Sequence, residues 1–464
     1  MALEASPAGS AESRPGAGHA RALEARLLIG AELRHLLRLS LPIILTQLSQ
    51  MGMGVADTVM AGRYSSADLA GVALGGNLYW PSILLLSGVM MALIPSVSQL
   101  HGSGNQDRAG EVVRQSLWIG FAGGLVLVIG FQNTEPFYRT MGIDPLAVPI
   151  AADYLRGASW GVLPLMGYFA LRYLCEGLSW TLPAMLIALF ALLLKVPLNY
   201  LFIHGGAGIP ALGGSGCGWA SAVVFWLQFG VLACIASASR IRVTGVFSRF
   251  SPPDLVAIRR LLKLGLPIGL TSFLEISMFS IVTLLVGRLG VEAVAAHQIA
   301  TSVGGLAFMV PMAIGMAAAI RVGFNIGAGD LPGARRSGTI AIGMALVFSV
   351  LAVTLILAAR APIAGLYTNE LAVMALAMEL MLFVALFQIV DASQVAAIGA
   401  LRGFKDTRVP MMVALLAYWA VGLPVGVLLG FNLTGLSSSV SSLEGVRGFW
   451  VGLCAGLAVA AVIL

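Results

Sequence analysis

The sequence predicts an all-α polytopic membrane protein with twelve transmembrane helices in two pseudo-symmetric six-helix bundles around a central cavity. The 464 residues are 58% hydrophobic and only 10% charged, whereas about a quarter of the positions in a soluble domain carry a charge. Apolar runs of the roughly 20 residues that a helix needs to cross a bilayer recur along the whole chain. The two halves of the chain also repeat one residue pattern, which indicates two related bundles.

The apolar runs locate the twelve helices in order. They fall at 39–61, 71–98, 116–132, 147–174, 181–203, 215–238, 262–287, 294–324, 337–358, 371–399, 409–430 and 446–464. Residues 1–32 are polar and do not resemble a cleavable signal peptide, so we expect a mobile cytoplasmic tail there. The predicted domains that follow are an N-terminal six-helix lobe at 33–238, a cytoplasmic linker at 239–261 and a C-terminal six-helix lobe at 262–464. Proline and glycine within several runs predict kinks.

The basic residues set the predicted orientation. With the N-terminus inside, 20 of the 27 Lys and Arg residues lie in inner segments, among them Arg172, 6 lie in outer segments, and Lys195 lies within a helix. The positive-inside rule then places both termini in the cytoplasm. The net charge of +6 therefore reflects topology, and nucleic acid is not an expected partner. Because the sequence ends in apolar residues at Leu464, we expect that a cytoplasmic tail is missing.

The repeat between the halves has a nearly constant offset. Residue pairs 225 positions apart include Pro42 and Pro267, Arg63 and Arg288, and Gly102 and Gly327. Each half contains six predicted helices, an even number, so both halves insert the same way up and are related by an axis along the membrane normal. A transport path between the two halves is the natural consequence.

Three acidic residues fall inside predicted helices: Asp57 in the first, Glu275 in the seventh and Asp391 in the tenth. An acid at the centre of a membrane helix costs roughly 2.5–3.5 kcal/mol on insertion scales, so such residues have a partner or a use. We expect Glu275 and Asp391 to form an acidic pair within the second half. The chain as a whole is expected to build a polar cavity around the three acids.

Uncharged and basic residues accompany these acids. Gln50 is the repeat partner of Glu275 and lies seven residues before Asp57, hence on the same helix face, and it is a candidate cavity-lining residue. Lys195 and Asn199 lie one turn apart on the fifth helix and can face Asp57.

Two interpretations of the buried acids are open. Carboxylates are hard oxygen ligands that suit Na⁺, and a buried carboxyl beside a second one can exchange protons. These residues would then form a cation site or a proton relay. The alternative is a structural role, in which hydrogen bonds or ion pairs hold helices together, and this alternative is stronger for Lys195 and for the neutral polar residues.

These residues resemble the multidrug and toxic compound extrusion family, in its bacterial branch typified by the norfloxacin exporters. The matching stretches are VADTVMAG with Asp57, KVPLNYLF with Asn199, LKLGLPIGLTSFLEISMF with Glu275, VEAVAAHQIA with Gln298 and DASQVAAIGALRGFKDTRVP with Asp391. The resemblance covers about residues 33–464. It implies an antiporter, not an enzyme, that exports organic cations and amphiphilic drugs by alternating access in exchange for Na⁺ or H⁺, with no cofactor besides the coupling ion.

The resemblance also implies roles for single residues. Glu275 and Asp391 would couple the ion, and would be the Na⁺ ligands if the protein is sodium-coupled. Asp57 would be the acid of the first lobe, with Asn199 beside it. The choice between Na⁺ and H⁺, and between the two lobes as the coupling site, stays open.

The remaining implied residues would line the cavity. Gln298 would lie in the second-lobe cavity, Glu370 would face the outer cavity, and Gln388 and Lys195 complete the candidate set. One departure concerns Phe387, because some relatives have Tyr at this position, four residues before the helix-ten acid.

A lipid-linked oligosaccharide flippase of the same superfamily is the main alternative. Such proteins usually line their cavity with several cations, whereas the interior of this chain offers acids and Lys195. A GxGD intramembrane protease motif at Gly327–Asp330 is disfavoured, because the repeat shows this segment to be an inner loop. We expect a monomer in a bacterial cytoplasmic (inner) membrane, with membrane lipid and cationic or amphiphilic drugs as its partners.

Overall fold

The structure is a computed structural model that describes residues 17–141, 145–206, 208, 210–433 and 444–464. The helices in chain order are α1 (Ala17–Tyr64), α2 (Ser66–Met90), α3 (Leu93–Gly102), η1 (Gln106–Arg108), α4 (Ala109–Gln132), α5 (Glu135–Thr140), α6 (Ala147–Ser159), α7 (Val162–Gly177), α8 (Leu182–His204), η2 (Gly213–Ser215), α9 (Gly216–Ala238), η3 (Arg240–Thr244), α10 (Leu255–Val286), η4 (Gly287–Leu289), α11 (Val291–Gly327), α12 (Leu331–Ala358), α13 (Arg360–Tyr367), α14 (Leu371–Gly403), α15 (Arg408–Ala414), the π-helical η5 (Leu415–Gly422), α16 (Leu423–Gly430) and α17 (Val446–Ile463).

All twelve predicted spans are helical. Ten segments of the described chain are long and apolar enough to cross a membrane. The two other predicted spans are the second half of α1 and the pair α6 and α7. The predicted tail differs in part: residues 1–16 lie outside the described residues, and from Ala17 onward the chain already belongs to α1.

Proline explains where two of these spans break. The proline ring clashes with the carbonyl four residues earlier, and proline lacks the N–H that would bond to it. The break between α2 and α3 begins at Met91, four residues before Pro95, and the break between α6 and α7 begins at Trp160, four residues before Pro164. Pro267, in contrast, is accommodated within the continuous helix α10.

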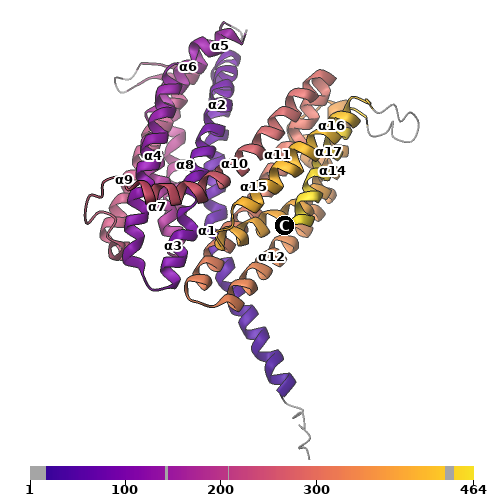
Figure 1. Cartoon of the computed structure of the whole chain (residues 1–464). Helices are drawn as coiled ribbons and strands as arrows, with labels where there is room; N and C mark the ends of the chain where they lie inside the picture. Colours follow the sequence, from indigo (N-terminus) through magenta and orange to yellow (C-terminus); the bar gives the residue numbers. More distant parts are fainter. Residues whose placement is uncertain (1–16, 142–144, 207, 209, 434–443) are drawn as a thin grey trace, which may run out of the picture.

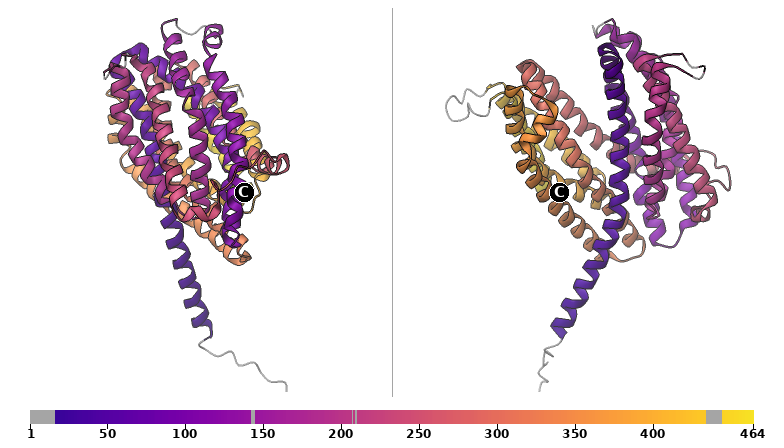
Figure 2. Two further views of the ribbon diagram at one scale, coloured as in Figure 1. Left: turned by 90° about the vertical axis from the view of Figure 1, so that its left-hand side faces the viewer. Right: turned by 180° about the vertical axis from the view of Figure 1, so that it is seen from behind.

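The helices form two groups, which we call the N-terminal lobe (α1–α9) and the C-terminal lobe (α10–α17). Figures 1 and 2 show α2–α9 on one side of the molecule and α11–α17 on the other. The first helix of each half makes contacts across this division. Helix α1 packs on α8 and α2 in its own lobe and on α11 and α12 in the other, while α10 packs on α2 and on α15. The domain boundaries at 33–238, 239–261 and 262–464 stay a prediction.

Glycines let the two lobes touch at one end of the molecule. A Cβ atom added at Gly102 would lie 1.9 Å from the carbonyl oxygen of Phe324, and one added at Gly327 would lie 2.0 Å from that of Gln99. Only a residue without a side chain allows this approach. The two contacts are related by the same 225-residue offset as the sequence repeat, so this glycine seam (Gln99, Gly102, Phe324, Gly327) lies on the pseudo-symmetry axis.

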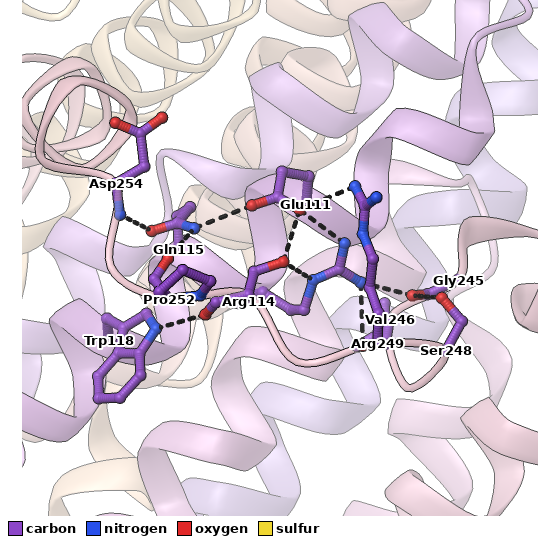
Figure 3. Close-up of polar contacts among 11 residues, drawn as sticks. Glu111, Arg114, Gln115, Trp118, Gly245, Val246, Ser248, Arg249, Pro252 and Asp254 are labelled. Atoms are coloured by element: carbon purple, nitrogen blue, oxygen red, sulfur yellow. Dashed lines mark hydrogen bonds and ion pairs between the residues drawn. The ribbon is translucent and has the colours of Figure 1, made fainter.

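The second half of the linker is bound to the N-terminal lobe (Figure 3). Helix α4 presents four side chains to it, and one of them, Glu111, accepts from Ser251 Oγ at 2.8 Å. The Arg114 guanidinium donates to Ser251 Oγ at 2.8 Å, and the Trp118 indole donates to the Ser251 carbonyl at 3.0 Å. Gln115 donates to the Pro252 carbonyl at 3.0 Å. The linker is therefore an ordered strap on α4 up to the start of α10.

Candidate transport sites in the two lobes

The acid of the N-terminal lobe is paired within its own lobe. Asp57 on α1 is 6% exposed. Its Oδ1 accepts from Asn199 Nδ2 at 2.7 Å and lies 2.9 Å from Lys195 Nζ. Lys195 and Asn199 are one turn apart on α8, so both reach the same carboxylate, as their spacing predicts.

Lys195 is itself fully engaged. Its ammonium also donates to the carbonyl of Cys217 at 3.0 Å and to the hydroxyl of Ser221, both on α9. The three donors of an ammonium thus have three acceptors, and both charges of the pair are compensated. This arrangement links α1, α8 and α9 in one polar network at the centre of the N-terminal lobe.

The acids of the C-terminal lobe have a different environment. Glu275 on α10 and Asp391 on α14 line one cavity of about 400 Å³. Asp391 is 1% exposed, and neither of its carboxylate oxygens has a hydrogen-bond partner among the described residues. A buried carboxylate without a partner is costly, so the site favours a cation or a proton at these oxygens.

Most of this cavity is apolar, and both lobes contribute to it. Its walls include Phe279, Met309, Met316, Phe387 and Trp450. Methionine side chains adapt to irregular shapes, and aromatic faces attract organic cations. The cavity therefore combines two acids and one cation, Arg402, with a wall suited to amphiphilic cations.

One polar side chain of the N-terminal lobe also lines this cavity. Gln47 of α1 accepts from Arg172 Nη2 at 2.9 Å and lies 3.7 Å, through its Nε2, from the sulfur of Met312 on α11. Arg172 is paired with Glu176 at 2.7 Å, and both are at most 2% exposed. Arg172 therefore lies within α7 with its charge neutralised there, and its assignment to the inner side stays a prediction.

The six predicted cavity residues are not among those that line the 400 Å³ cavity; Lys195 and Asn199 contact Asp57, and the other four lie elsewhere. Gln50 is half-buried one turn from Gln47, and Gln298 is exposed on α11. Gln388 is buried, and neither atom of its side-chain amide has a hydrogen-bond partner among the described residues. Its backbone carbonyl accepts from Ser349 Oγ of α12 at 3.1 Å.

Glu370 precedes the first residue of α14 and is exposed. It is thus far along the helix from Asp391, about 30 Å at 1.5 Å per residue. Helix rotation and length, which a repeat offset does not determine, decide which residues line this cavity, and the predicted roles of these six residues stay predictions.

The sequence profile of the MatE family matches residues 42–201 and 267–428. The chain belongs to the MATE family. It is 42% identical over 440 residues to the Multidrug resistance protein PmpM of Pseudomonas aeruginosa, which covers 94% of this chain and 91% of that protein. It is 40% identical over 435 residues to the Multidrug resistance protein MdtK of Yersinia enterocolitica, which covers 93% of this chain and 94% of that protein.

Solved MATE structures share the fold. The eukaryotic MATE transporter AtDTX14 superposes with a TM-score of 0.83 at 20% identity, over 94% of this chain and 95% of that one. An outward-facing multidrug resistance MATE family transporter of the MOP superfamily superposes with a TM-score of 0.82 at 19% identity, over the same shares. The predicted fold class is confirmed: this MATE chain is a multi-pass membrane transporter with two helical bundles.

Proposed function

We propose that this MATE-family chain is a secondary multidrug exporter that exchanges organic cations and amphiphilic drugs for Na⁺ or H⁺. The two bacterial relatives described above are named multidrug resistance proteins. The single observation that carries the ion-exchange part of the proposal is the pair Glu275 and Asp391, which lines an apolar cavity with both Asp391 oxygens unpartnered. The lipid-linked oligosaccharide flippase is not favoured by these relatives.

The proposed mechanism follows from charge balance. An inward-moving Na⁺ or H⁺ neutralises the acidic pair of the C-terminal lobe, and the cationic drug then loses the charge that held it. Because the cationic drug and the coupling ion compete for one pair of carboxylates, binding of either one drives release of the other. The glycine seam closes one end between the lobes, and rocking of the lobes about this contact would expose the cavity to the other side in turn.

Gln47 gives the N-terminal lobe a contact with this exchange. Its amide is held by Arg172 and lies against Met312 in the wall of the cavity. A change in the charge of the cavity would therefore alter the electrostatic environment of Gln47, which is hydrogen-bonded to Arg172 in the N-terminal lobe. For Na⁺, the ligands would be the carboxylate oxygens of Glu275 and Asp391. In the described part of the chain no group of three or more His, Cys, Asp or Glu side chains could hold a metal, so no further metal ligand is proposed.

We also propose a place for the protein: a monomer in a bacterial cytoplasmic membrane, with both termini inside. The count of Lys and Arg residues supports this orientation.

Efflux of a fluorescent organic cation from proteoliposomes tests the proposed function. The efflux is driven separately by an inward Na⁺ gradient and by an inward H⁺ gradient, at zero membrane potential. Drive by Na⁺ alone supports fixed carboxylate ligands, and drive by H⁺ alone supports protonation of the acids. If neither gradient drives efflux of any organic cation, the proposal is wrong.

A further inference from the structure

A second cavity, of about 630 Å³, opens at the end of the molecule that carries the glycine seam. Its walls come from three parts of the chain: α3 and α4 of the N-terminal lobe, the first turns of α10, and the turn 404–407 between α14 and α15. It lies next to the strap of Figure 3, since Glu111 and Gln115 belong to both. The positive-inside rule assigns this end to the cytoplasm.

Four basic side chains line this cavity: Arg260 and Lys263 on α10, Lys405 in the turn, and Arg408 at the start of α15. Within the part of the chain that the structure describes, none of the four has an ion pair or a side-chain hydrogen bond. Its surroundings partly remove water from the Lys405 ammonium, which lowers the pKa of that group. An anion bound in the cavity would balance the charge of the Lys405 ammonium together with the charges of the other three cations.

The two acids of the lining do not neutralise these cations. The Glu111 carboxylate already accepts from Arg114 at 2.7 Å, from Gln115 at 2.9 Å and from Ser251 at 2.8 Å. Asp406 accepts from the backbone N–H of Val409 at 3.3 Å. The cavity therefore keeps a net positive charge.

The rest of the lining is apolar. Leu100, Val112, Leu261, Leu264 and Phe404 supply a wall on which hydrocarbon can lie. Cations at the rim and an apolar wall below match an amphiphilic anion, and basic pockets between helices at the cytoplasmic surface suit lipid phosphates.

The cavity also lies where the lobes are tied together. Gln99 of α3 donates to the carbonyl of Gly403 at the end of α14 at 3.0 Å. Within the C-terminal lobe, Thr407 Oγ1 donates to the carbonyl of Leu264 on α10 at 2.9 Å, which fixes the α14–α15 turn beside the first turns of α10. A molecule in the cavity would thus contact α3 and α4 of one lobe and the α14–α15 turn of the other.

We propose that this cavity binds the phosphate of an anionic phospholipid from the cytoplasmic leaflet, with an acyl chain along the apolar wall, and that the bound lipid holds the lobes together at the glycine seam. The proposal does not depend on which drug or ion is transported, because its test is a binding measurement.

The test compares two triple variants of the full chain that lose the same charge. The cavity variant is Arg260→Gln, Lys263→Gln and Arg408→Gln. The control variant is Arg108→Gln, Arg259→Gln and Arg335→Gln, whose three arginines are exposed and lie outside the lining. Arg259 is next to Arg260 in sequence, so the control carries a closely matched change on the same helix.

Palmitoyl-oleoyl phosphatidylglycerol is titrated into each detergent-solubilised protein, and bound lipid is counted by native mass spectrometry. Phosphatidylcholine with the same chains and inorganic phosphate are titrated in parallel. Each cation near a phosphate contributes about fivefold in affinity, so we expect the cavity variant to bind phosphatidylglycerol at least about tenfold more weakly than the wild type. The control variant should stay within about threefold.

Three results would overturn the proposal. They are equal binding of phosphatidylglycerol by both variants, equal binding of phosphatidylcholine and phosphatidylglycerol by the wild type, and binding of inorganic phosphate as tight as that of the lipid. Thermal unfolding of the wild type and both variants checks that all three are folded. A general effect of lost surface charge would weaken lipid binding by the control variant as much as by the cavity variant.

Discussion

Each lobe contains a buried acid, but the protein balances the charge of only one of the two. Asp57 has a lysine and an asparagine within 2.9 Å, while both oxygens of Asp391 lack a partner in the described chain. A carboxylate whose charge is already balanced by the protein gains little from a further cation. The comparison therefore supports the proposal that the mobile ion binds in the C-terminal lobe and that the N-terminal network is a structural element.

The comparison also shows how a repeat can diverge. Helices α1 and α10 are equivalent, and both cross between the lobes. Asp57 on α1 faces α8 of its own lobe, whereas Glu275 on α10 faces a cavity to which α1 contributes Gln47. The same helical framework thus provides an internal ion pair on one side and an open acidic site on the other.

The largest effect is expected from removing the lysine of the N-terminal lobe. Lys195→Met leaves Asp57 buried without its cation and should lower the free energy of unfolding by about 3–5 kcal/mol. The double variant with Asp57→Asn should lose clearly less, because no charge is then left unpaired. Glu275→Gln removes an acid that forms no direct ion pair in the described chain, although Arg402 lines the same cavity, so it should cost clearly less stability than Lys195→Met. Equilibrium unfolding in mixed micelles measures all three, and equal losses for Lys195→Met and Glu275→Gln would erase the distinction between the lobes.

The next effect concerns transport. If the C-terminal acids couple the ion, Glu275→Gln and Asp391→Asn should each lower gradient-driven efflux by about 5- to 150-fold, the usual range of a coupling free energy. Glu379→Gln is the matched control, because Glu379 lies on the same helix α14 but forms an exposed pair with Arg447. Rates are compared per folded protein in proteoliposomes. Normal efflux by either cavity variant would show that the coupling site lies elsewhere.

A further acid, Glu32, is shared between the lobes and extends the comparison. It lies ahead of the predicted first span, and Arg321 of α11 donates to its two oxygens at 2.8 and 2.6 Å. Ser337 of α12 donates to it at 2.7 Å. Glu32→Gln should cost about 2 kcal/mol of stability, because charge-assisted bonds are lost.

The effect of Glu32 should depend on pH. Burial raises the pKa of this carboxyl, but the bonds from Arg321 and Ser337 outweigh burial, so its pKa lies below the ordinary value. Its contribution is therefore present above the pKa of the unfolded chain and is lost as the pH falls through the lower folded-state pKa. The stability difference between wild type and Glu32→Gln should shrink on acidification in unfolding measurements from pH 7 downward. A constant difference would mean that the carboxylate charge contributes nothing.

The smallest effect is expected at Phe387 in the cavity wall. Phe387→Tyr adds one hydroxyl oxygen to a site whose acids lack partners, a gain of about 0.5–1.5 kcal/mol for one hydrogen bond or ligand. The Na⁺ or H⁺ concentration that gives half-maximal efflux should shift by up to about tenfold. Phe308→Tyr, on α11 in the same cavity wall, serves as the control for a hydroxyl elsewhere in the cavity, since the ring of Phe279 contacts that of Phe387. An equal shift in both variants would contradict a site centred on Asp391.

The sequence predicts well what depends on hydrophobicity and helix spacing. Apolar length located all twelve spans, and the four-residue spacing of Lys195 and Asn199 placed both on the face that meets Asp57. Prolines indicated breaks, although only Pro95 and Pro164 interrupt their helices four residues earlier. Length and periodicity are local properties, so the sequence alone determines them.

What the sequence missed depends on how helices rotate against one another. The repeat indicated Gln50, but its neighbour one turn earlier, Gln47, lines the cavity, because equivalence along the chain does not fix the rotation of α1. Arg172 was counted among the cations of the inner segments, at the end of an apolar run, and its burial in an ion pair was not predicted. Its partner Glu176, four residues later, was the available signal, since an acid and a base at this spacing pair on one helix face.

The strap on α4 limits how far the two lobes can separate. A free segment from residue 239 to residue 254 could extend by roughly 50 Å, at 3.3 Å per residue. Because Ser251 and Pro252 are bonded to α4, and the N–H of Asp254 donates to Gln115 at 2.8 Å, almost none of that contour length is available as slack. The effective tether is the single peptide between Asp254 and the first residue of α10. The two lobes can rotate about that point, but the short connection prevents them from moving apart.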